Sequence, residues 1–235
     1  MSSVVLQVTD LQLVKGRQTI LDIPFLSVTE GEVLVIMGPN GAGKTTLLQV
    51  LAALQPPTTG TITFRGYNVT RLNPVKLRRR MAVVFQEPLL LDTTVYENVA
   101  VGLKIRGVPR AERHARVEKW LDRLGISGLA QRSVRYLSGG EAQRVSLARA
   151  FVLEPEVLFM DEPFSALDRE SRLSLLEEIG SLLKSTRLTT VFVTHRQSEA
   201  LMLADSLCFM EAGRIVRRET VGQFQKRLGP VADWV

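Results

Sequence analysis

Residues 38–45 read Gly-Pro-Asn-Gly-Ala-Gly-Lys-Thr, and their types and spacing suit the binding of a phosphate chain. The octet fits the pattern G-x-x-x-x-G-K-[S/T], in which glycines let the backbone turn several N–H groups toward phosphate oxygens. Lys44 is predicted to reach the β- and γ-phosphates, and the Thr45 hydroxyl to ligate Mg²⁺. The motif therefore predicts a nucleoside triphosphate site. Its expected contacts on this loop are Gly38, Pro39, Asn40, Gly41, Ala42, Gly43, Lys44, Thr45 and Thr46.

Two adjacent carboxylates form a second chemical element. Asp161 and Glu162 follow the apolar run 157–160, which is typical of a buried strand. Ligands collect at the carboxyl ends of strands in open α/β sheets, so both acids are expected beside the phosphates. Asp161 is predicted to hold the Mg²⁺ shell, and Glu162 to polarise the attacking water. Neighbouring strand residues face opposite ways, and for this reason the two acids can serve different roles.

The phosphate loop can act only between a strand and a helix, and the sequence supplies both. Residues 33–37 are an unbroken apolar run, typical of a strand inside a parallel sheet. Residues 45–54 place apolar side chains at helical spacing. The first N–H groups of such a helix point at a bound anion. The flanks therefore favour a phosphate loop over an ordinary glycine-rich turn.

Beyond these motifs the chain alternates strands and helices after an antiparallel start. Strands are expected at residues 4–8, 12–14, 19–26, 61–64, 81–85, 157–160, 189–193 and 207–210, with a hairpin turn at Gly213-Arg214. Between residues 86 and 154 the pattern is mostly helical, as in residues 111–124. We therefore predict one α/β domain, residues 1–235, with two lobes. Residues 1–85 and 155–235 form a nucleotide-binding lobe, and residues 86–154 form an inserted helical lobe.

Composition limits the classes of function. With 235 residues, of which 45% are hydrophobic, the chain can build one domain around a large core. The apolar runs fall far short of the roughly 20 residues that cross a bilayer, and residues 1–5 do not resemble the start of a secretory signal. The single cysteine, Cys208, excludes an intrachain disulfide and is predicted to be a buried structural thiol. A net charge of +6 suits a nucleotide, nucleic acid or anionic lipid alike.

A third motif covers residues 137–144, Leu-Ser-Gly-Gly-Glu-Ala-Gln-Arg. Ser138 and Glu141 have the spacing of a capping box, and the two glycines keep side chains away from the helix entrance, as a second anion site requires. A plain helix cap explains an isolated Ser-Gly-Gly equally well. The whole octet, however, is similar to the signature of ATP-binding-cassette (ABC) proteins. Nearly the whole chain resembles that family, with its motifs in the family's order.

The resemblance implies a P-loop NTPase (RecA-like) parallel sheet with an N-terminal antiparallel β subdomain and an inserted α-helical subdomain. Gln86 resembles the Q-loop glutamine, which touches the metal or its water and passes movement to the partner domain. His195 resembles the switch histidine, which contacts the γ-phosphate. The implied catalytic residues are Lys44, Gln86, Glu162 and His195. The implied metal ligands are Thr45, Gln86 and Asp161.

The resemblance also implies a dimer. In this family two cassettes stack head to tail, so each ATP lies between one phosphate loop and the signature helix of the other chain. Ser138, Gly139 and Gly140 would then bind the nucleotide of the second copy. Asp168 belongs to the D-loop, residues 165–168, which crosses the dimer interface, and it is counted with the nucleotide contacts.

Two positions depart from the family pattern. The family usually stacks adenine on an aromatic residue, but Lys15 stands at that position, before Gly16. Stacking must therefore come from aliphatic stems such as those of Val14 or Lys15, or be weak. The residue after the switch histidine is often acidic in related importers, and here it is Arg196. This leaves the hydrolytic residues in place and changes the local charge.

Residues 161–168 and 194–200 resemble those of ATPase subunits of bacterial importers that are supplied by a binding protein. Residues 85–91 and 94–99 are similar to those of tungstate- and molybdate-type oxyanion importers. The resemblance implies ATP hydrolysis coupled to import, at the cytoplasmic face of the membrane and without nucleic acid. The implied partners are a second ATPase subunit, transmembrane permease subunits and, indirectly, an extracytoplasmic substrate-binding protein. Because the sequence stops soon after Trp234, no additional oxyanion-sensing domain is expected.

Alternatives remain for the transport system and for three segments. An exporter ATPase and a soluble cassette ATPase acting on ribosomes or DNA remain alternatives. The sequence has neither the second cassette usual in ribosomal types nor the long coiled coil of DNA-repair types. Neighbouring genes for a binding protein and a permease would favour import. Leu89–Leu91 either line a groove for a membrane-subunit helix or belong to the core. Arg78–Arg80 are interpreted as a solvated helix end and His114 as a solvated side chain.

Overall fold

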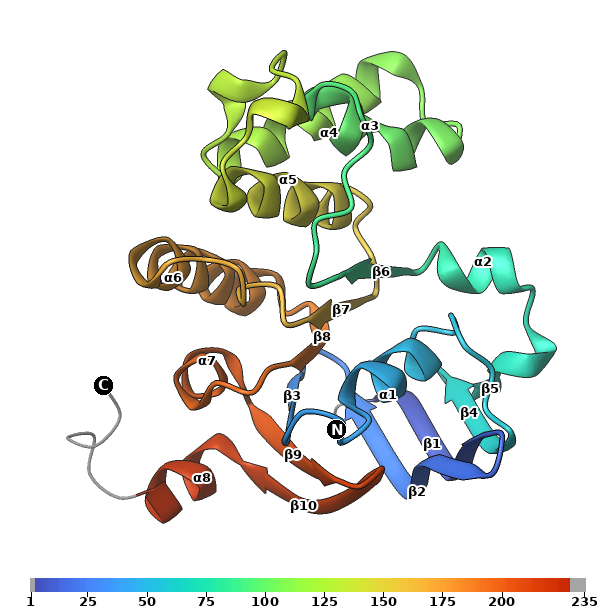
Figure 1. Ribbon diagram of the computed structural model, residues 1–235. Coiled ribbons are helices and arrows are strands. Elements are labelled where there is room, and N and C mark those ends of the chain that lie inside the picture. Colours follow the sequence, from blue (N-terminus) through green and yellow to red (C-terminus); the bar gives the residue numbers. More distant parts are fainter. Residues whose placement is uncertain (1–2, 229–235) are drawn as a thin grey trace.

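The computed structural model describes residues 3–228, and Figure 1 shows how its elements are arranged. The strands are β1 Val4–Lys15, β2 Gln18–Thr29, β3 Val33–Met37, β4 Thr59–Phe64, β5 Tyr67–Asn68, β6 Met81–Val84, β7 Val157–Asp161, β8 Thr189–Val193, β9 Ser206–Glu211 and β10 Arg214–Thr220. The helices are α1 Lys44–Leu51, α2 Pro74–Arg78, α3 Val95–Ile105, α4 Arg110–Arg123, α5 Gly139–Phe151, α6 Arg169–Thr186, α7 Gln197–Leu203 and α8 Val221–Leu228. Within residues 3–228 no helix is both long and apolar enough to cross a membrane. The expectations about the chain's two ends involve Met1, Ser2 and Trp234, which lie outside the described residues.

Two sheets organise these elements. An antiparallel sheet has the strand order β2-β1-β4-β5, and a larger sheet has the order β10-β9-β3-β8-β7-β6. In the larger sheet β9, β3, β8, β7 and β6 run parallel, while β10 pairs antiparallel with β9. Parallel neighbours need long crossover connections, and helices supply most of them. Helix α1 contacts β2 of one sheet and both β7 and β8 of the other, so it packs where the two sheets meet (Figure 1).

The parallel strands serve two cores at once, one on each face of their sheet. Along β3, Val33, Val35 and Met37 pack into the core under the helices. Leu34 and Ile36, between them, pack into the core shared with α1 and the antiparallel sheet. Successive strand residues point to opposite faces, so both sets must be apolar. This explains why β3 appears in the sequence as an unbroken apolar run.

Helices α3, α4 and α5 lie together at one end of the molecule (Figure 1). Trp120, one of the buried residues of α4, stacks on Phe151 of α5 with 4.9 Å between ring centroids. Polar contacts join α5 to the segment after β6. The Arg149 guanidinium donates to the carbonyl oxygens of Pro88 at 2.7 Å and Leu89 at 2.9 Å. Helix α5 therefore holds this segment by hydrogen bonds to the main-chain carbonyl groups of the segment.

Several predicted boundaries are wrong. Strand β1 is continuous where the pattern predicts two strands, because it pairs with both β2 and β4 and takes up the break as a register shift between Thr9 and Gln12. Helix α1 ends at Leu51 rather than near residue 54, since Ala53 has a φ of 55°. Strand β6 ends one residue early, at residue 84. Arg80 is not simply solvated, because its guanidinium lies 4.4 Å from the centre of the Phe64 ring.

Other single-residue predictions have mixed outcomes. Cys208 is fully buried in β9, as predicted, and burial raises the pKa of its thiol to about 12. The β9–β10 hairpin turns at residues 212 and 213, one position earlier than predicted. His114 is exposed, as predicted, but its Nδ1 lies 3.3 Å from the Tyr96 hydroxyl. Leu89 and Leu91 are exposed, whereas Leu90 packs against the core, so the core interpretation holds for Leu90 alone and the groove stays a prediction.

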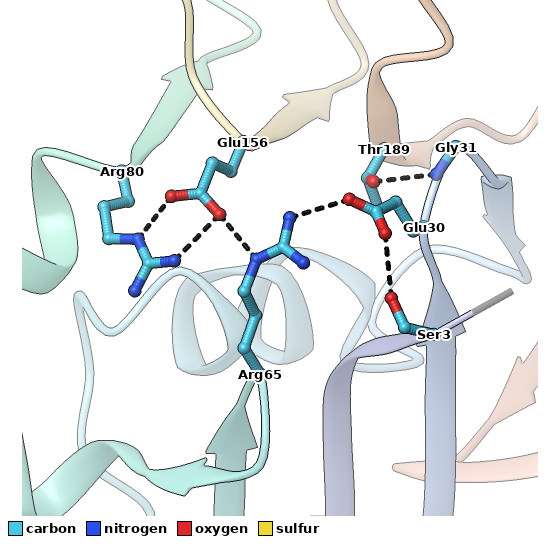
Figure 2. Close-up of polar contacts among 7 residues, drawn as sticks. All are labelled: Ser3, Glu30, Gly31, Arg65, Arg80, Glu156 and Thr189. Atoms are coloured by element: carbon cyan, nitrogen blue, oxygen red, sulfur yellow. Dashed lines mark hydrogen bonds and ion pairs between the residues drawn. The ribbon is translucent and has the colours of Figure 1, made fainter.

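A chain of ion pairs joins the two sheets at the amino-terminal edge of the parallel strands (Figure 2). Glu156, just before β7, accepts hydrogen bonds from Arg80, just before β6, and from Arg65 Nε at 2.6 Å. Arg65, in the β4–β5 turn, also donates to Glu30 at 2.8 Å, and Glu30 accepts from the Ser3 hydroxyl at 2.8 Å. The hydrogen bonds from Arg80 and Arg65 hold the pKa of the Glu156 carboxyl below its usual range.

Replacing Glu156 with Gln should lower the free energy of unfolding by about 1 kcal/mol at neutral pH, because two arginines lose their shared anion. The native pKa of Glu156 is lowered, so the ionised carboxylate stabilises the fold above the unfolded-state pKa. That contribution disappears as the pH falls through the native pKa. Urea unfolding at neutral pH and near pH 3 should therefore show a difference between the two proteins that shrinks in acid.

The matched control for this variant is Glu112→Gln. Glu112 forms an ion pair with Arg116, one helical turn away on α4, at 2.6 Å. This pair lies on one helix and does not link the two sheets. Its removal should change the free energy of unfolding by less than about 0.5 kcal/mol. Equal effects of the two substitutions on the free energy of unfolding would show that the contact between the sheets stabilises the fold no more than an ordinary surface ion pair does.

Candidate nucleotide site

Four segments with predicted chemistry follow the carboxyl ends of four neighbouring strands. The phosphate loop follows β3, His195 follows β8, Glu162 follows β7 and Gln86 lies two residues beyond β6. The strand order β3-β8-β7-β6 places these segments side by side. A cleft of about 550 Å³ opens at this edge, where ligands bind in open α/β folds. Its walls are Ile20, Asn40, Gly41, Gly43, Lys44, Thr45, Thr46, Gln86, Glu162, Ser165 and His195.

Two glycines give the phosphate loop its shape. Gly38 has a φ of 155°, and a Cβ at this position would lie 2.2 Å from the carbonyl oxygen of Met210. Gly43 precedes α1 in the left-handed conformation, with a φ of 95°, and no side chain caps this helix. The first turn of α1 also lacks an acidic residue. The N–H groups that begin α1 are therefore left for an anion in the cleft.

Lys44 is the buried cation of the cleft, with 6% of its side chain exposed. Its ammonium group donates to the carbonyl oxygens of Gly38 at 2.9 Å and Pro39 at 3.0 Å. Oε1 of Glu162 lies 3.9 Å away. A buried ammonium group whose hydrogen bonds go to neutral carbonyls gains from a nearby anion, so this position suits a phosphate.

Thr45 and Asp161, two of the predicted metal ligands, are in contact. The Thr45 hydroxyl donates to Oδ1 of Asp161 at 3.0 Å. Burial raises the pKa of the Asp161 carboxyl and the Glu162 carboxylate adds to this, while the hydrogen bond from Thr45 and the charge of Lys44 oppose it. A divalent cation would favour the ionised carboxylate. Within residues 3–228 no group of three His, Cys, Asp or Glu side chains could hold a metal ion.

Glu162 and His195 form a hydrogen-bonded pair in the cleft. Nδ1 of His195 lies 2.9 Å from Oε2 of Glu162. Glu162 has a φ of 43°, an uncommon conformation for a residue with a side chain, and its N–H donates to the carbonyl oxygen of Val193 at 3.0 Å. This strained backbone places the carboxylate between Lys44 and His195. Strain of this kind gathers at functional sites, where the surrounding structure maintains it.

The signature motif lies outside the cleft. Ser138 accepts a hydrogen bond from the Glu141 N–H at 3.2 Å, and the Glu141 carboxylate accepts from the Ser138 N–H at 2.7 Å, which confirms the predicted capping box. Ser138 and Gly140 line a different hollow, between α5 and α6. Asp168 caps the first turn of α6. One copy of the chain thus assembles part of the predicted site, and these predicted residues stay apart from the phosphate loop: Ser138, Gly139, Gly140 and Asp168.

Two walls of the cleft, Ile20 and Ser165, are not among the predicted nucleotide contacts. Ile20 belongs to β2 of the antiparallel sheet, and its carbonyl oxygen would lie 3.2 Å from a Cβ on Gly43. No pattern in the sequence signals this contact, because it depends on how the two sheets pack. Ser165 is the first residue of the D-loop, three residues after Glu162, and that motif is the signal that could have placed it in the cleft. Lys15 is exposed, and none of the described residues that line the cleft is Phe, Tyr or Trp.

A parallel sheet with a glycine loop, a buried lysine and a Thr–Asp pair at its carboxyl edge defines a P-loop nucleotide-binding protein. A family model described as "ABC transporter" matches residues 21–165, more than half of the chain. The protein therefore belongs to the ABC transporter family.

Three relatives of this chain are named as ATP-binding proteins of import systems. Over 201 residues the chain is 45% identical to the sulfate/thiosulfate import ATP-binding protein CysA of Mycobacterium tuberculosis, covering 85% of this chain and 57% of the relative. It is 40% identical over 215 residues to the spermidine/putrescine import ATP-binding protein PotA of Bacteroides fragilis, covering 91% and 46%. It is 40% identical over 203 residues to the Fe(3+) ions import ATP-binding protein FbpC of Escherichia coli, covering 86% and 58%. The chain thus spans about half the length of these relatives.

Solved structures share the fold over nearly the whole chain. CbiO1 of Clostridium perfringens, part of the ABC transporter complex cbiONQ, gives a TM-score of 0.88 at 28% identity, covering 96% of this chain and 93% of that one. The ATP-binding cassette MJ0796, solved as a dimer in a post-hydrolysis state with ADP and Pi, gives a TM-score of 0.84 at 27% identity, covering 92% and 98%. These matches confirm the predicted fold class, a P-loop NTPase with antiparallel and parallel sheets.

Proposed function

We propose that this protein is an ATP-hydrolysing subunit that energises a membrane importer. One observation carries the proposal: Lys44, Thr45, Gln86, Glu162 and His195 come from four separate segments and line one cleft. The cassette dimer solved with ADP and Pi supports hydrolysis in this fold. The names of the relatives, all import ATP-binding proteins, support import over export.

The geometry of the cleft suits attack of a water molecule on the γ-phosphate of ATP. Lys44 exchanges its contacts with loop carbonyls for the β- and γ-phosphates and stabilises their charge. Glu162 orients and polarises the water, and His195 holds Glu162 in place and contacts the γ-phosphate. A bound Mg²⁺, with Thr45, Asp161 and Gln86 near it, would neutralise charge that develops between the β- and γ-phosphates.

A second copy of the chain supplies the missing contacts. The glycines after Ser138 leave the start of α5 open, so this helix can meet a nucleotide held by the partner's phosphate loop. ATP binding then closes the dimer and hydrolysis reopens it. Residues 86–154 act as one helical lobe, and the segment after Gln86 passes the movement to the permease. We place the subunit at the cytoplasmic face of the membrane, without nucleic acid.

For the cargo we propose an oxyanion such as tungstate or molybdate, delivered by an extracytoplasmic binding protein. The sulfate/thiosulfate relative supports an oxyanion, whereas the other two relatives are named for a polyamine and for Fe(3+). None of these three names includes tungstate or molybdate. Deleting the gene and measuring uptake of labelled molybdate, tungstate, sulfate, iron and spermidine separates these cargoes. Loss of iron or spermidine uptake alone would contradict the oxyanion assignment.

Hydrolysis by the purified protein is the direct test of the proposed activity. We expect release of phosphate from ATP at about 0.1 to 10 per second, since typical enzymes turn over at about 1 to 1,000 per second and this subunit is tested without its permease. Chelating Mg²⁺ with EDTA should abolish the release, because the charge between the phosphates is then unshielded. Release that persists unchanged in EDTA, or no binding of a fluorescent ATP analogue, would contradict the assigned site.

A further inference from the structure

A buried carboxylate that the mechanism above does not use lies behind the switch histidine. Glu199, on α7, is 2% exposed. Its Oε2 accepts a hydrogen bond from the Thr194 hydroxyl at 2.5 Å, and that hydroxyl oxygen accepts from the Arg196 N–H at 3.0 Å. Thr194 and Arg196 are the two neighbours of His195 in the chain. The turn that carries the histidine is thus fixed from behind through both of its neighbours.

The surroundings of Glu199 have opposing effects on the pKa of its carboxyl group. Burial raises the pKa of its carboxyl, and this effect exceeds the lowering by the Thr194 hydroxyl and by the charges of Arg196 and Arg172. Arg196 Nε lies 3.8 Å from Oε1 of Glu199, and within residues 3–228 neither atom has a hydrogen-bond partner. A carboxylate held this way costs stability, since its ionised form is poorly solvated and incompletely paired. The hydrogen bonds of Glu199 connect it to the two chain neighbours of His195. A role in positioning that histidine would explain why a carboxylate is buried here.

We propose that Glu199 is a positioning residue for His195. Acting through Thr194 and the Arg196 N–H, it fixes the turn so that the imidazole meets Glu162 and the γ-phosphate. The Thr194 N–H also donates to the carbonyl oxygen of Ile36 at 3.2 Å, which ties the front of the turn to β3. Glu199 holds the opposite side of the turn, through the Thr194 hydroxyl. The inference rests on the proposed ATPase function for its kinetic consequences.

The expected consequence is a slower chemical step with ATP binding preserved, because Lys44 and the phosphate loop do not depend on this turn. Glu199→Ala should lower kcat about 10- to 100-fold, as small misplacements of catalytic groups do, and should change the KM for ATP by less than about threefold. Glu199→Gln retains an oxygen that accepts the Thr194 hydroxyl, and it should keep kcat within about threefold of the unaltered protein.

A double-mutant cycle tests whether Glu199 acts through Thr194. Thr194→Val has the same shape as threonine and lacks the hydroxyl, so it should reproduce the loss in kcat. Combining it with Glu199→Ala should add less than about twofold, because both substitutions break the same link. Independent effects that multiply would overturn the proposal. If Glu199→Ala does not fold, Thr194→Val and Glu199→Gln still decide the outcome.

The matched control is Glu32→Ala. Glu32 is also a largely buried carboxylate, with 10% of its side chain exposed, and it pairs with Arg218 at 2.8 Å. It stands just before β3, at the end of that strand opposite to the phosphate loop. Its loss should lower the free energy of unfolding while leaving kcat within about twofold, measured at a temperature where both variants are folded. An equal fall of kcat in Glu32→Ala and Glu199→Ala would overturn the proposal.

A second readout does not depend on hydrolysis. The chain has two histidines, His114 and His195, so their imidazole NMR signals can be assigned with His114→Gln. Glu199→Ala should shift the signals of His195 and leave those of His114 in place, and Glu32→Ala should move neither. Unmoved His195 signals, or an unchanged kcat, would overturn the positioning role. A protein that hydrolyses no ATP would instead contradict the proposed function, and the NMR comparison would then decide this inference by itself.

Discussion

Glu162→Gln should bind ATP about as tightly as the unaltered protein and hydrolyse it about a thousandfold more slowly, within the range that a general base contributes. The amide has the size of the carboxylate, so the left-handed backbone at residue 162 and the neighbouring Lys44 should keep their places. It cannot accept a proton from the attacking water. Phosphate release and the affinity for a fluorescent ATP analogue measure the two expectations separately.

The proposed dimer gives this variant a second readout. Because ATP is not consumed, Glu162→Gln should run as a dimer in ATP during size-exclusion chromatography, and as a monomer after the nucleotide is removed. Glu177→Gln, an exposed glutamate on α6, is the matched control and should keep normal turnover. Near-normal turnover of Glu162→Gln would rule out its role as the base.

Lys44→Ala should weaken ATP binding at least about 100-fold and reduce hydrolysis to background, because a charge-assisted contact with phosphate is worth about 1.5 to 3 kcal/mol before cooperative effects. The alanine also leaves the carbonyl oxygens of Gly38 and Pro39 without their donor in the nucleotide-free protein, so the fold of the variant needs its own check. Isothermal titration with ATP measures the affinity, and circular dichroism checks that the fold is intact.

Lys76→Ala is the control for Lys44→Ala. Lys76 is an exposed lysine on α2, so its loss changes the net charge by the same amount without altering the cleft. ATP affinity should stay within about twofold, as expected for a remote charge screened by salt. If both variants lose affinity equally, the effect belongs to the overall charge of the protein and the buried position of Lys44 has no special part in binding.

The strands and the phosphate loop could be predicted because their signals are local. The run 33–37 is apolar on both faces of a buried strand, and the octet at 38–45 carries its own glycines, lysine and threonine. The capping box at Ser138 was predictable for the same reason, since both partners lie within one helical turn. Patterns of this length record the needs of one element and its termini.

Contacts between distant segments could not be predicted from the residues alone. Thr45 and Asp161 are 116 positions apart, and Glu162 and His195 are 33 apart. The resemblance to a family brought these residues into one list, but their contacts follow from the order of β3, β8, β7 and β6 in the sheet. The bond between Arg65 and Glu156, over 91 positions, had no signal in the sequence, because two charged residues near turns look solvated.

The double-sided burial of the parallel strands restricts how this protein can vary in length. A one-residue insertion in β3 would send Val33, Val35 and Met37 into the core that Leu34 and Ile36 fill, and the reverse. It would also displace the phosphate loop by one residue, about 3.3 Å, at the end of the strand. We therefore expect insertions and deletions to be tolerated only in connections such as residues 53–58, which lie outside helices and strands. Packing on both faces of the sheet therefore fixes the number of residues between a strand and the site residues that follow it, as strictly as the chemistry of the site does.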